Sequence, residues 1–194
     1  MHHVYTVEAI IVKSVPIGEA NKYYFLLTKD LGLIKASAQG VRLGKSKLKG
    51  HLQDFNFISV SLVKGKNIWR ITSVDTLNSF NFLRSLNKLV AIKNVFSLLL
   101  RLVHGEEKNE SLFNVVGLFY DFLTKNNLSL EDIKSLEIIT VLRILYYLGY
   151  FKKSFDLIDF VDNNQISAEV IESFADKKRA AIADINEALK ESHL

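Results

Sequence analysis

The hydrophobic periodicity of this 194-residue chain changes once, near residue 80. Before that point apolar and polar residues alternate, as in residues 33–39, where Ile, Ala and Ala alternate with Lys, Ser and Gln. A period of two is typical of a strand with one buried face. After that point apolar residues recur every three or four positions, as in amphipathic helices. We therefore predict an α+β chain, with a β domain over residues 1–80 and an all-helical domain over residues 81–194.

The β domain contains five strand-like segments, with a long connection after the third. Their predicted bounds are residues 6–17, 22–28, 33–39, 55–63 and 68–76. Five short strands in about 75 residues indicate a small five-stranded antiparallel barrel. The OB-fold is the commonest such barrel that binds single-stranded nucleic acid, and an SH3-like barrel is the structural alternative. Periodicity alone does not separate these two folds.

The helical domain is predicted to contain three long helices, one short helix and a final amphipathic helix. The long helices are expected at residues 83–104, at 111–124, and from a capping box at Ser129 to Leu148, with the short one near 155–160 and the last after Ser167. The third helix is apolar on nearly all sides from residue 138 to its end. Such a helix is expected at the centre of a bundle.

The long connection, residues 38–55, is the most basic part of the chain. No acidic residue occurs between Asp30 and Asp54, whereas Lys35, Arg42, Lys45, Lys47 and Lys49 all lie in that interval. The whole β domain holds 11 Lys and Arg against 5 Asp and Glu, a net charge of +6, whereas the helical domain holds 14 against 16, a net −2. A glycine-containing cationic loop suits a phosphate backbone, and a solvated loop without a ligand is the alternative.

Two further residues are candidates for binding. Trp69, beside Arg70 on the last strand, is the best candidate for stacking on a base, although a lone Trp on a strand is usually buried. Arg143 lies within the apolar third helix. It either reaches the surface or pairs with Glu137 or Asp121, or its guanidinium borders a groove that holds the acidic tail of a partner.

No pattern in the sequence indicates catalysis, a metal site or a cofactor. The chain has no cysteine, its five histidines lack ligand-like spacing, and Gly40 to Ser46 is one residue short of a phosphate-binding P-loop. We therefore expect a protein that is not an enzyme and has no metal and no cofactor. No apolar run reaches the ~18 residues of a membrane span, and the first residues do not resemble a secretion signal, so no membrane role is expected.

Several motifs of the β domain occur together in one family. They are Glu8-Ala-Ile-Ile-Val-Lys13-Ser14, Gly18-Glu19-Ala20-Asn21, Leu26-x-Thr28-x-x-x-Gly32, the loop pattern Gly40-x-Arg42-x-x-Lys45-Ser46-x-Leu48-x-Gly50-x-Leu52-Gln53-x-Phe55, and Trp69-Arg70-Ile71. With Leu142-Arg143-Ile144-Leu145-x-x-Leu148-Gly149-Tyr150 further on, the chain resembles the RecO recombination mediators of DNA repair. The N-terminal resemblance covers nearly all of residues 7–80, and the C-terminal one is shorter.

The resemblance implies an OB-fold followed by a helical domain, in a cytoplasmic protein associated with the bacterial nucleoid. It implies binding of single- and double-stranded DNA, annealing of complementary strands, and partnership with RecR and the C-terminal tail of single-strand-binding protein. Through these partners such proteins help to load the recombinase RecA. The DNA-binding residues implied are Lys13, Lys35, Arg42, Lys45, Lys47, Lys49 and Arg70.

The chain also differs from the family pattern. Gln39 and Val41 stand where a basic and a small residue are more usual, and the four cysteines of a zinc-binding insertion found in many relatives are missing. Because these cysteines are missing, we predict a protein without zinc. Two other function classes are alternatives on the residues alone: an RNA-binding OB protein, and an adaptor whose basic loop binds no nucleic acid.

Overall fold

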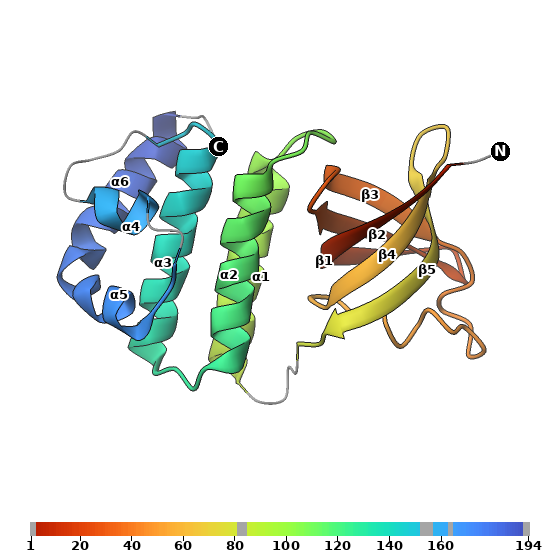
Figure 1. The fold of residues 1–194 in the computed structure, drawn as a ribbon, viewed down its shortest axis with the longest axis horizontal. Coiled ribbons are helices and arrows are strands. Elements are labelled where there is room, and N and C mark those ends of the chain that lie inside the picture. Colours follow the sequence, from red (N-terminus) through yellow and green to blue (C-terminus); the bar gives the residue numbers. More distant parts are fainter. Residues whose placement is uncertain (1–2, 81–84, 152–156, 163–164, 192–194) are drawn as a thin grey trace. The chain divides into compact units, whose positions relative to one another are not determined.

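The structure is a computed structural model, and it describes residues 3–80, 85–151, 157–162 and 165–191. The chain divides into two compact units (Figure 1). The first contains residues 1–81 and 104–113, and the second contains residues 82–103 and 114–194. This division differs from a single boundary at residue 80, because the segment His104–Phe113 clusters with the strands rather than with the helices.

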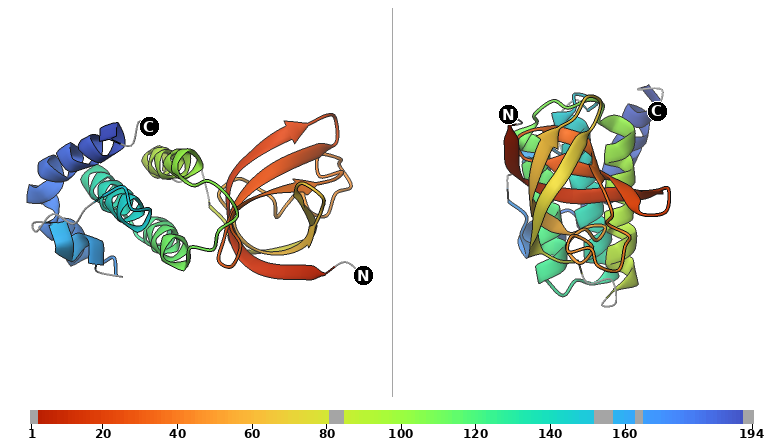
Figure 2. Two further views of the ribbon diagram at one scale, coloured as in Figure 1. Left: turned by 90° about the horizontal axis from the view of Figure 1, so that it is seen from above. Right: turned by 90° about the vertical axis from the view of Figure 1, so that its right-hand side faces the viewer.

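The five strands of the first unit form a closed barrel (Figure 2). They are β1 (Val4–Ile17), β2 (Asn21–Thr28), β3 (Gly32–Ala38), β4 (Phe57–Lys64) and β5 (Trp69–Asn78). Their order around the barrel is β1-β2-β3-β5-β4, and β4 pairs again with β1. This order is that of the OB-fold, so the topology separates the two barrels that periodicity left open.

The prediction of a purely antiparallel barrel was wrong for one pair of strands. Ala36 and Ser37 of β3 pair in parallel with Trp69 and Arg70 of β5. The reason is geometric: a closed ring with an odd number of strands cannot alternate in direction at every step. One neighbouring pair must therefore run parallel, and here it is the pair that closes the barrel next to the long connection.

The barrel interior is filled by the alternate side chains of all five strands. Tyr24, Leu26, Ile34 and Leu62 are essentially inaccessible to solvent, as is most of the cluster around them. The strand β3 shows the pattern most clearly, because every second residue is buried. The opposite side chains of the same strands therefore form the outer face that a ligand can reach.

The second unit is a set of helices around α3. They are α1 (Leu86–Leu102), α2 (Glu110–Lys125), α3 (Leu130–Tyr147), α4 (Ile158–Asp162), α5 (Ala168–Ser173), the short 3-10 helix η3 (Ala175–Lys177) and α6 (Lys178–Glu191), with the first residues of α2 assigned to the first unit. The helix α3 packs against α1, α4, α5 and α6. Its apolar sequence on all sides is explained by this central position, as predicted.

The prediction of one final helix after Ser167 was wrong. Ser167 does cap a helix, because its Oγ accepts from Val170 N, but α5 ends at Ser173 and the chain continues through η3 into α6. Phe174 at the break is fully buried and stacks edge-on against Phe160 at 5.0 Å between ring centroids. The buried Phe174 ring thus lies at the residue between the end of α5 and the start of η3.

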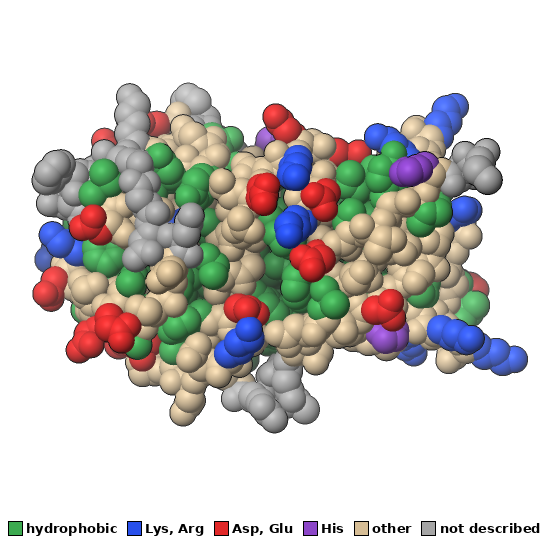
Figure 3. Space-filling view, viewed as in Figure 1, with side chains coloured by type: hydrophobic (Ala, Val, Ile, Leu, Met, Phe, Trp, Pro, Cys, Tyr) green, Lys and Arg blue, Asp and Glu red, His purple; other side chains and the backbone are tan. Residues whose placement is uncertain are grey.

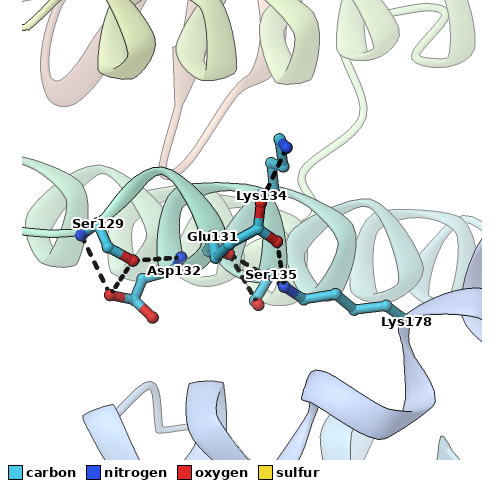
Figure 4. A network of polar contacts seen from close by, with 6 residues as sticks. All are labelled: Ser129, Glu131, Asp132, Lys134, Ser135 and Lys178. Carbon is cyan, nitrogen blue, oxygen red and sulfur yellow. Dashed lines mark hydrogen bonds and ion pairs between the residues drawn. The ribbon is translucent and has the colours of Figure 1, made fainter.

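The N-terminus of α3 is held by the predicted capping box (Figure 4). Asp132 N donates to Ser129 Oγ, and Ser129 N donates to Asp132 Oδ2, each at 3.1 Å. We expect Ser129→Ala to lower the free energy of unfolding by about 1 kcal/mol, because it leaves a helix N–H without its acceptor. Thermal unfolding followed by circular dichroism measures this loss.

Ser135→Ala is the matched control for that prediction. Its hydroxyl donates to Glu131 O within the same helix, where the carbonyl already accepts the helical hydrogen bond. The control variant should unfold within about 0.5 kcal/mol of the parent. Equal losses in the two variants would contradict a specific capping role for Ser129.

Candidate nucleic-acid interface

The basic loop between β3 and β4 is anchored to the barrel by its apolar residues. Val41 and Leu52 are each 2% exposed and belong to the barrel core, and Leu48 packs against them. Between these anchors the backbone forms successive turns, with Ser46 N donating to Leu43 O and Leu52 N donating to Leu48 O. The loop is therefore a folded element rather than a free solvated segment.

The start of the loop is docked on the turn between β1 and β2. Gly40 N donates to Asn21 Oδ1 at 2.8 Å, and Arg42 N donates to Ala20 O at 2.9 Å. The Arg42 guanidinium also donates to Gly18 O at 2.7 Å. These three bonds fix the position of Arg42 while leaving the side chain exposed. Its remaining N–H groups are available to an anion in a fixed orientation.

Two aromatic rings lie on the outer face of β2. Tyr24 and Leu26 point into the barrel, so Tyr23 and Phe25 between them point outward, and both are half-buried. Lys35 of β3 pairs with Phe25, and its Nζ lies 4.3 Å from the Tyr23 ring centroid. This is a cation–π arrangement at an accessible surface. It places a positive charge directly beside two rings on which bases could stack.

Exposed cations flank these rings on the neighbouring strands. Lys13 of β1 pairs with Phe25, and Arg70 of β5 pairs with Ser37, which itself pairs with Tyr23. We call the set Tyr23, Phe25, Lys13, Lys35 and Arg70 the platform. The register of four strands thus brings together, around two aromatic rings, cations that lie far apart in the sequence.

All seven cations predicted to bind DNA are exposed on the first unit: Lys13, Lys35, Arg42, Lys45, Lys47, Lys49 and Arg70. Three of them belong to the platform. The other four belong to the loop, which begins directly after the pair Lys22–Ala38, at the start of β2 and the end of β3. In the space-filling view, Lys and Arg side chains project from the barrel at the lower right, where Figure 1 shows the loop (Figure 3).

The prediction that Trp69 stacks on a base is contradicted by its position. Trp69 is 3% exposed and belongs to the barrel core, where Tyr5 meets its ring edge-on at 5.3 Å between centroids. Its Nε1 donates to Glu106 Oε1 at 3.0 Å. Because Arg70 faces outward, the adjacent Trp69 must face inward. The half-buried rings of Tyr23 and Phe25 take the place in the site that the sequence assigned to Trp69.

Glu106 belongs to the segment His104–Phe113, which we call the strap. Its carboxylate also lies 3.6 Å from Lys64 Nζ, and Lys108 Nζ lies 3.2 Å from Asp30 Oδ1. The strap backbone passes so close to Gly32 that a Cβ there would clash with Glu107 O. The strap is therefore bound to the barrel by charge, by a buried indole and by direct backbone packing.

The close approach at Gly32 gives a stability prediction. Gly32 and Gly18 both have positive φ, 71° and 54°, but a Cβ at Gly18 would meet nothing within 4 Å. Gly18→Ala should lower the free energy of unfolding by about 1 kcal/mol through backbone strain alone. Gly32→Ala should lower it by about 3 kcal/mol, because the strap must also move. Urea unfolding followed by the fluorescence of Trp69 measures both, and equal losses would argue against tight strap packing.

Arg143 is placed differently from every sequence prediction. It is 1% exposed, its Nε donates to Phe160 O at 2.7 Å, and one terminal nitrogen donates to Gln165 O at 3.1 Å. Glu137 instead accepts from Asn94, and Asp121 pairs with Lys125. Burial lowers the pKa of Arg143. The side chain thus satisfies backbone carbonyls of the α4–α5 region, which contradicts a surface groove at Arg143 for a partner's tail.

The second unit does contain a groove of about 470 Å³, but its charge is unsuited to an acidic tail. It lies between the α2–α3 turn and α5, and Glu131, Asp132 and Glu172 line it. Lys178 is the single cation of the lining, and it is already paired with Glu131 at 3.1 Å (Figure 4). An acidic peptide would therefore meet three carboxylates here.

Sequence reasoning ranked Trp69 above Tyr23 and Phe25 as the ring that stacks on a base, and it missed Lys22. Tyr23, Tyr24 and Phe25 are three consecutive aromatic residues. Polar and apolar residues therefore do not alternate here, and the sequence does not show which side chains of β2 face the barrel interior. Lys35 could have identified the two outward rings. Once the register of the β2–β3 hairpin is fixed, Lys35 lies opposite Phe25, and a charged residue on β3 marks the outer face.

Among residues 3–80, 85–151, 157–162 and 165–191, no group of three or more His, Cys, Asp or Glu side chains is arranged to hold a metal ion. Within the same part of the chain, no helix combines the length and the apolar character needed to cross a membrane.

Residues 1–80 match the family model described as "Recombination protein O N terminal". The chain is similar to the "DNA repair protein RecO" of Dehalococcoides mccartyi, with 40% identity over 115 residues that cover 59% of this chain and 46% of that protein. The protein of the same name from Gloeothece citriformis is 33% identical over 118 residues, covering 60% and 42%, and that from Thermobifida fusca is 37% identical over 76 residues, covering 39% and 31%.

The chain spans less than half the length of these curated relatives. The similarity is anchored in the barrel, where the family model, the quoted motifs and the OB-fold topology coincide. Residues 1–80 of this chain are therefore similar to the N-terminal domain of RecO proteins.

Proposed function

We propose that the first unit binds DNA through the platform and the basic loop, and that the chain acts as a recombination mediator in DNA repair. The observation that carries this proposal is the convergence of Tyr23 and Phe25 with Lys13, Lys35 and Arg70 on one outer face of the barrel. Aromatic rings interleaved with cations suit a single strand, whose bases are free to stack while its phosphates are neutralised.

Binding of this kind is largely independent of sequence. Lys and Arg contacts to phosphate carry no base information, and stacking tolerates every base. Such a surface also suits annealing, because neutralised strands repel each other less. Double-stranded DNA would engage the loop cations more than the platform rings, since paired bases are not free to stack on Tyr23 and Phe25.

The mediator role is supported by the match of residues 1–80 to the model of the RecO N-terminal domain and by relatives named as DNA repair proteins. We extend the proposal to the partners that the family implies: RecR, single-strand-binding protein and, indirectly, RecA. The protein would act in the cytoplasm on nucleoid DNA, without catalysing a reaction. Because Arg143 is buried, the proposal assigns no role to it in binding the tail of single-strand-binding protein.

The salt dependence of binding tests the electrostatic part of this proposal. If four to seven of the exposed cations contact phosphates, the log–log slope of affinity against salt should lie between about −3 and −5 for a single strand. A fluorescein-labelled oligonucleotide titrated by anisotropy at several salt concentrations gives this slope. A flat response would remove phosphate contacts as the basis of binding.

Two further measurements separate the rival functions. Competition between DNA and RNA oligonucleotides of matched sequence shows which backbone is preferred, and a preference for RNA would favour the RNA-binding class. Annealing of complementary strands coated with single-strand-binding protein, with and without the chain, tests the mediator role. Absence of any oligonucleotide binding at physiological salt would favour the adaptor class.

A further inference from the structure

A small cavity lies in the first unit where the loop folds back on the start of β2. It has a volume of about 240 Å³. Its lining residues are Lys22, Tyr24, Val41, Arg42, Lys49, Leu52 and Gln53. The residues come from β2 and from both ends of the basic loop, which are 11 residues apart at Val41 and Leu52. The fold of the loop, rather than its sequence alone, therefore creates this cavity.

The charge of the cavity is entirely positive. Lys22, Arg42 and Lys49 line it, no carboxylate does, and none of the three forms an ion pair within the part of the chain that the structure describes. Lys22 Nζ has only a weak polar contact, with Ser14 Oγ at 3.3 Å. Three cations around one small space repel one another unless an anion lies between them.

The floor of the cavity is rigid and apolar. Val41, Leu52 and Tyr24 are buried, and the Tyr24 hydroxyl donates to Leu52 O at 3.4 Å. Burial, and to a lesser extent Asp54, raises the pKa of Tyr24, so the hydroxyl stays neutral. On the rim, Arg42 is fixed by Gly18 O, and Gln53 Nε2 donates to Lys49 O. The Arg42 guanidinium and the Lys49 backbone are thus held in place before any ligand binds.

We propose that Lys22, Arg42 and Lys49 form a seat for one phosphate group of a nucleic acid strand. A tetrahedral group with several charged oxygens can contact all three cations at once, whereas a carboxylate is fully satisfied by one guanidinium. The identity of the phosphate rests on the proposed function. Its source is either an internal phosphodiester or a terminal phosphate monoester, and the two share the chemistry that the seat recognises.

Lys47 provides the matched control for this seat. It lies two residues from Lys49 on the same loop and is exposed, but it does not line the cavity. Lys49→Gln and Lys22→Gln should each weaken oligonucleotide binding by about thirtyfold, because each removes a charge-assisted contact to a held phosphate. Lys47→Gln removes the same charge from a solvated position and should weaken binding by about threefold.

The binding assay uses two DNA oligomers that differ only in a 5′-phosphate or a 5′-hydroxyl. Large losses for Lys22→Gln and Lys49→Gln with both oligomers indicate an internal phosphate, and large losses with the phosphorylated oligomer alone indicate a terminal one. Equal, small losses for all three variants overturn the seat and leave only a general positive field, even if the parent binds DNA well.

A second readout keeps the seat separate from the proposed function. Pyrophosphate is titrated into the full chain while the backbone amide resonances of Arg42 and Lys49 are followed by NMR. If the parent fails to bind oligonucleotides but pyrophosphate shifts these two amides and not that of Lys47, the seat stands and the DNA-binding proposal fails. If pyrophosphate shifts neither amide and the variants match the parent, the seat is overturned.

Discussion

Replacing Arg42, Lys45, Lys47 and Lys49 together with alanine is expected to weaken binding of single-stranded DNA by about a thousandfold at 0.1 M salt. A mean loss of about 1 kcal/mol over the four cations, larger for Lys49 than for Lys47, gives about 4 kcal/mol in total, and each 1.4 kcal/mol is a factor of ten. The loop should keep its fold, because its anchors Val41 and Leu52 are unchanged. Anisotropy titration measures the affinity, and the salt slope should fall by about 3.

The control for this variant removes the same charge from the second unit. Lys93, Lys125, Lys134 and Lys190 are exposed on α1, α2, α3 and α6. Replacing these four with alanine changes the net charge equally, yet should weaken DNA binding by less than about fivefold. If both quadruple variants lose affinity to the same extent, the loop is not the binding site and net charge alone explains the interaction.

Removal of the outward rings is the second change with a large expected effect. Tyr23→Ala and Phe25→Ala should each weaken binding of a single strand by roughly tenfold to hundredfold, since a stacked base contributes about 1–3 kcal/mol. Tyr23→Phe keeps the ring and loses only the hydroxyl, so it should bind within about threefold of the parent. Each variant is titrated with the same labelled oligonucleotide.

Two features of that experiment distinguish stacking from a loss of charge. The salt slope should stay at the parent value in both alanine variants, because no cation is removed. Binding of a blunt duplex should change little, because its bases are already stacked on each other. Tyr23→Ala and Tyr23→Phe proteins with the same affinity for a single strand would show that the Tyr23 ring does not contact the bases.

Much of the fold follows from sequence because its signals are local. The five strands and the first three helices lie within a few residues of their predicted bounds, and the capping box at Ser129 is where the pattern placed it. The break at Phe174 was not predictable, because its apolar residues keep a helical period across the break. Tertiary burial of the Phe174 ring, not local preference, accompanies the break there.

The candidate site was predictable in its charge but not in its geometry. A run of cations without acids is visible in the sequence, so the exposed lysines and Arg42 were found. Which ring of β2 faces outward depends on strand register, and Trp69 was misplaced for that reason. Arg143 was misplaced because its acceptors are carbonyls of Phe160 and Gln165, and any residue can supply a carbonyl.

The strap has a consequence for how the chain can be divided into separate domains. Because residues 82–103 and 114–194 form one unit while His104–Phe113 belongs to the other, the polypeptide crosses between them three times. Cutting the chain once at residue 80 would leave a barrel without its Trp69 acceptor and with Gly32 uncovered. The fluorescence of the only tryptophan in the chain should therefore report whether the strap is bound to the barrel.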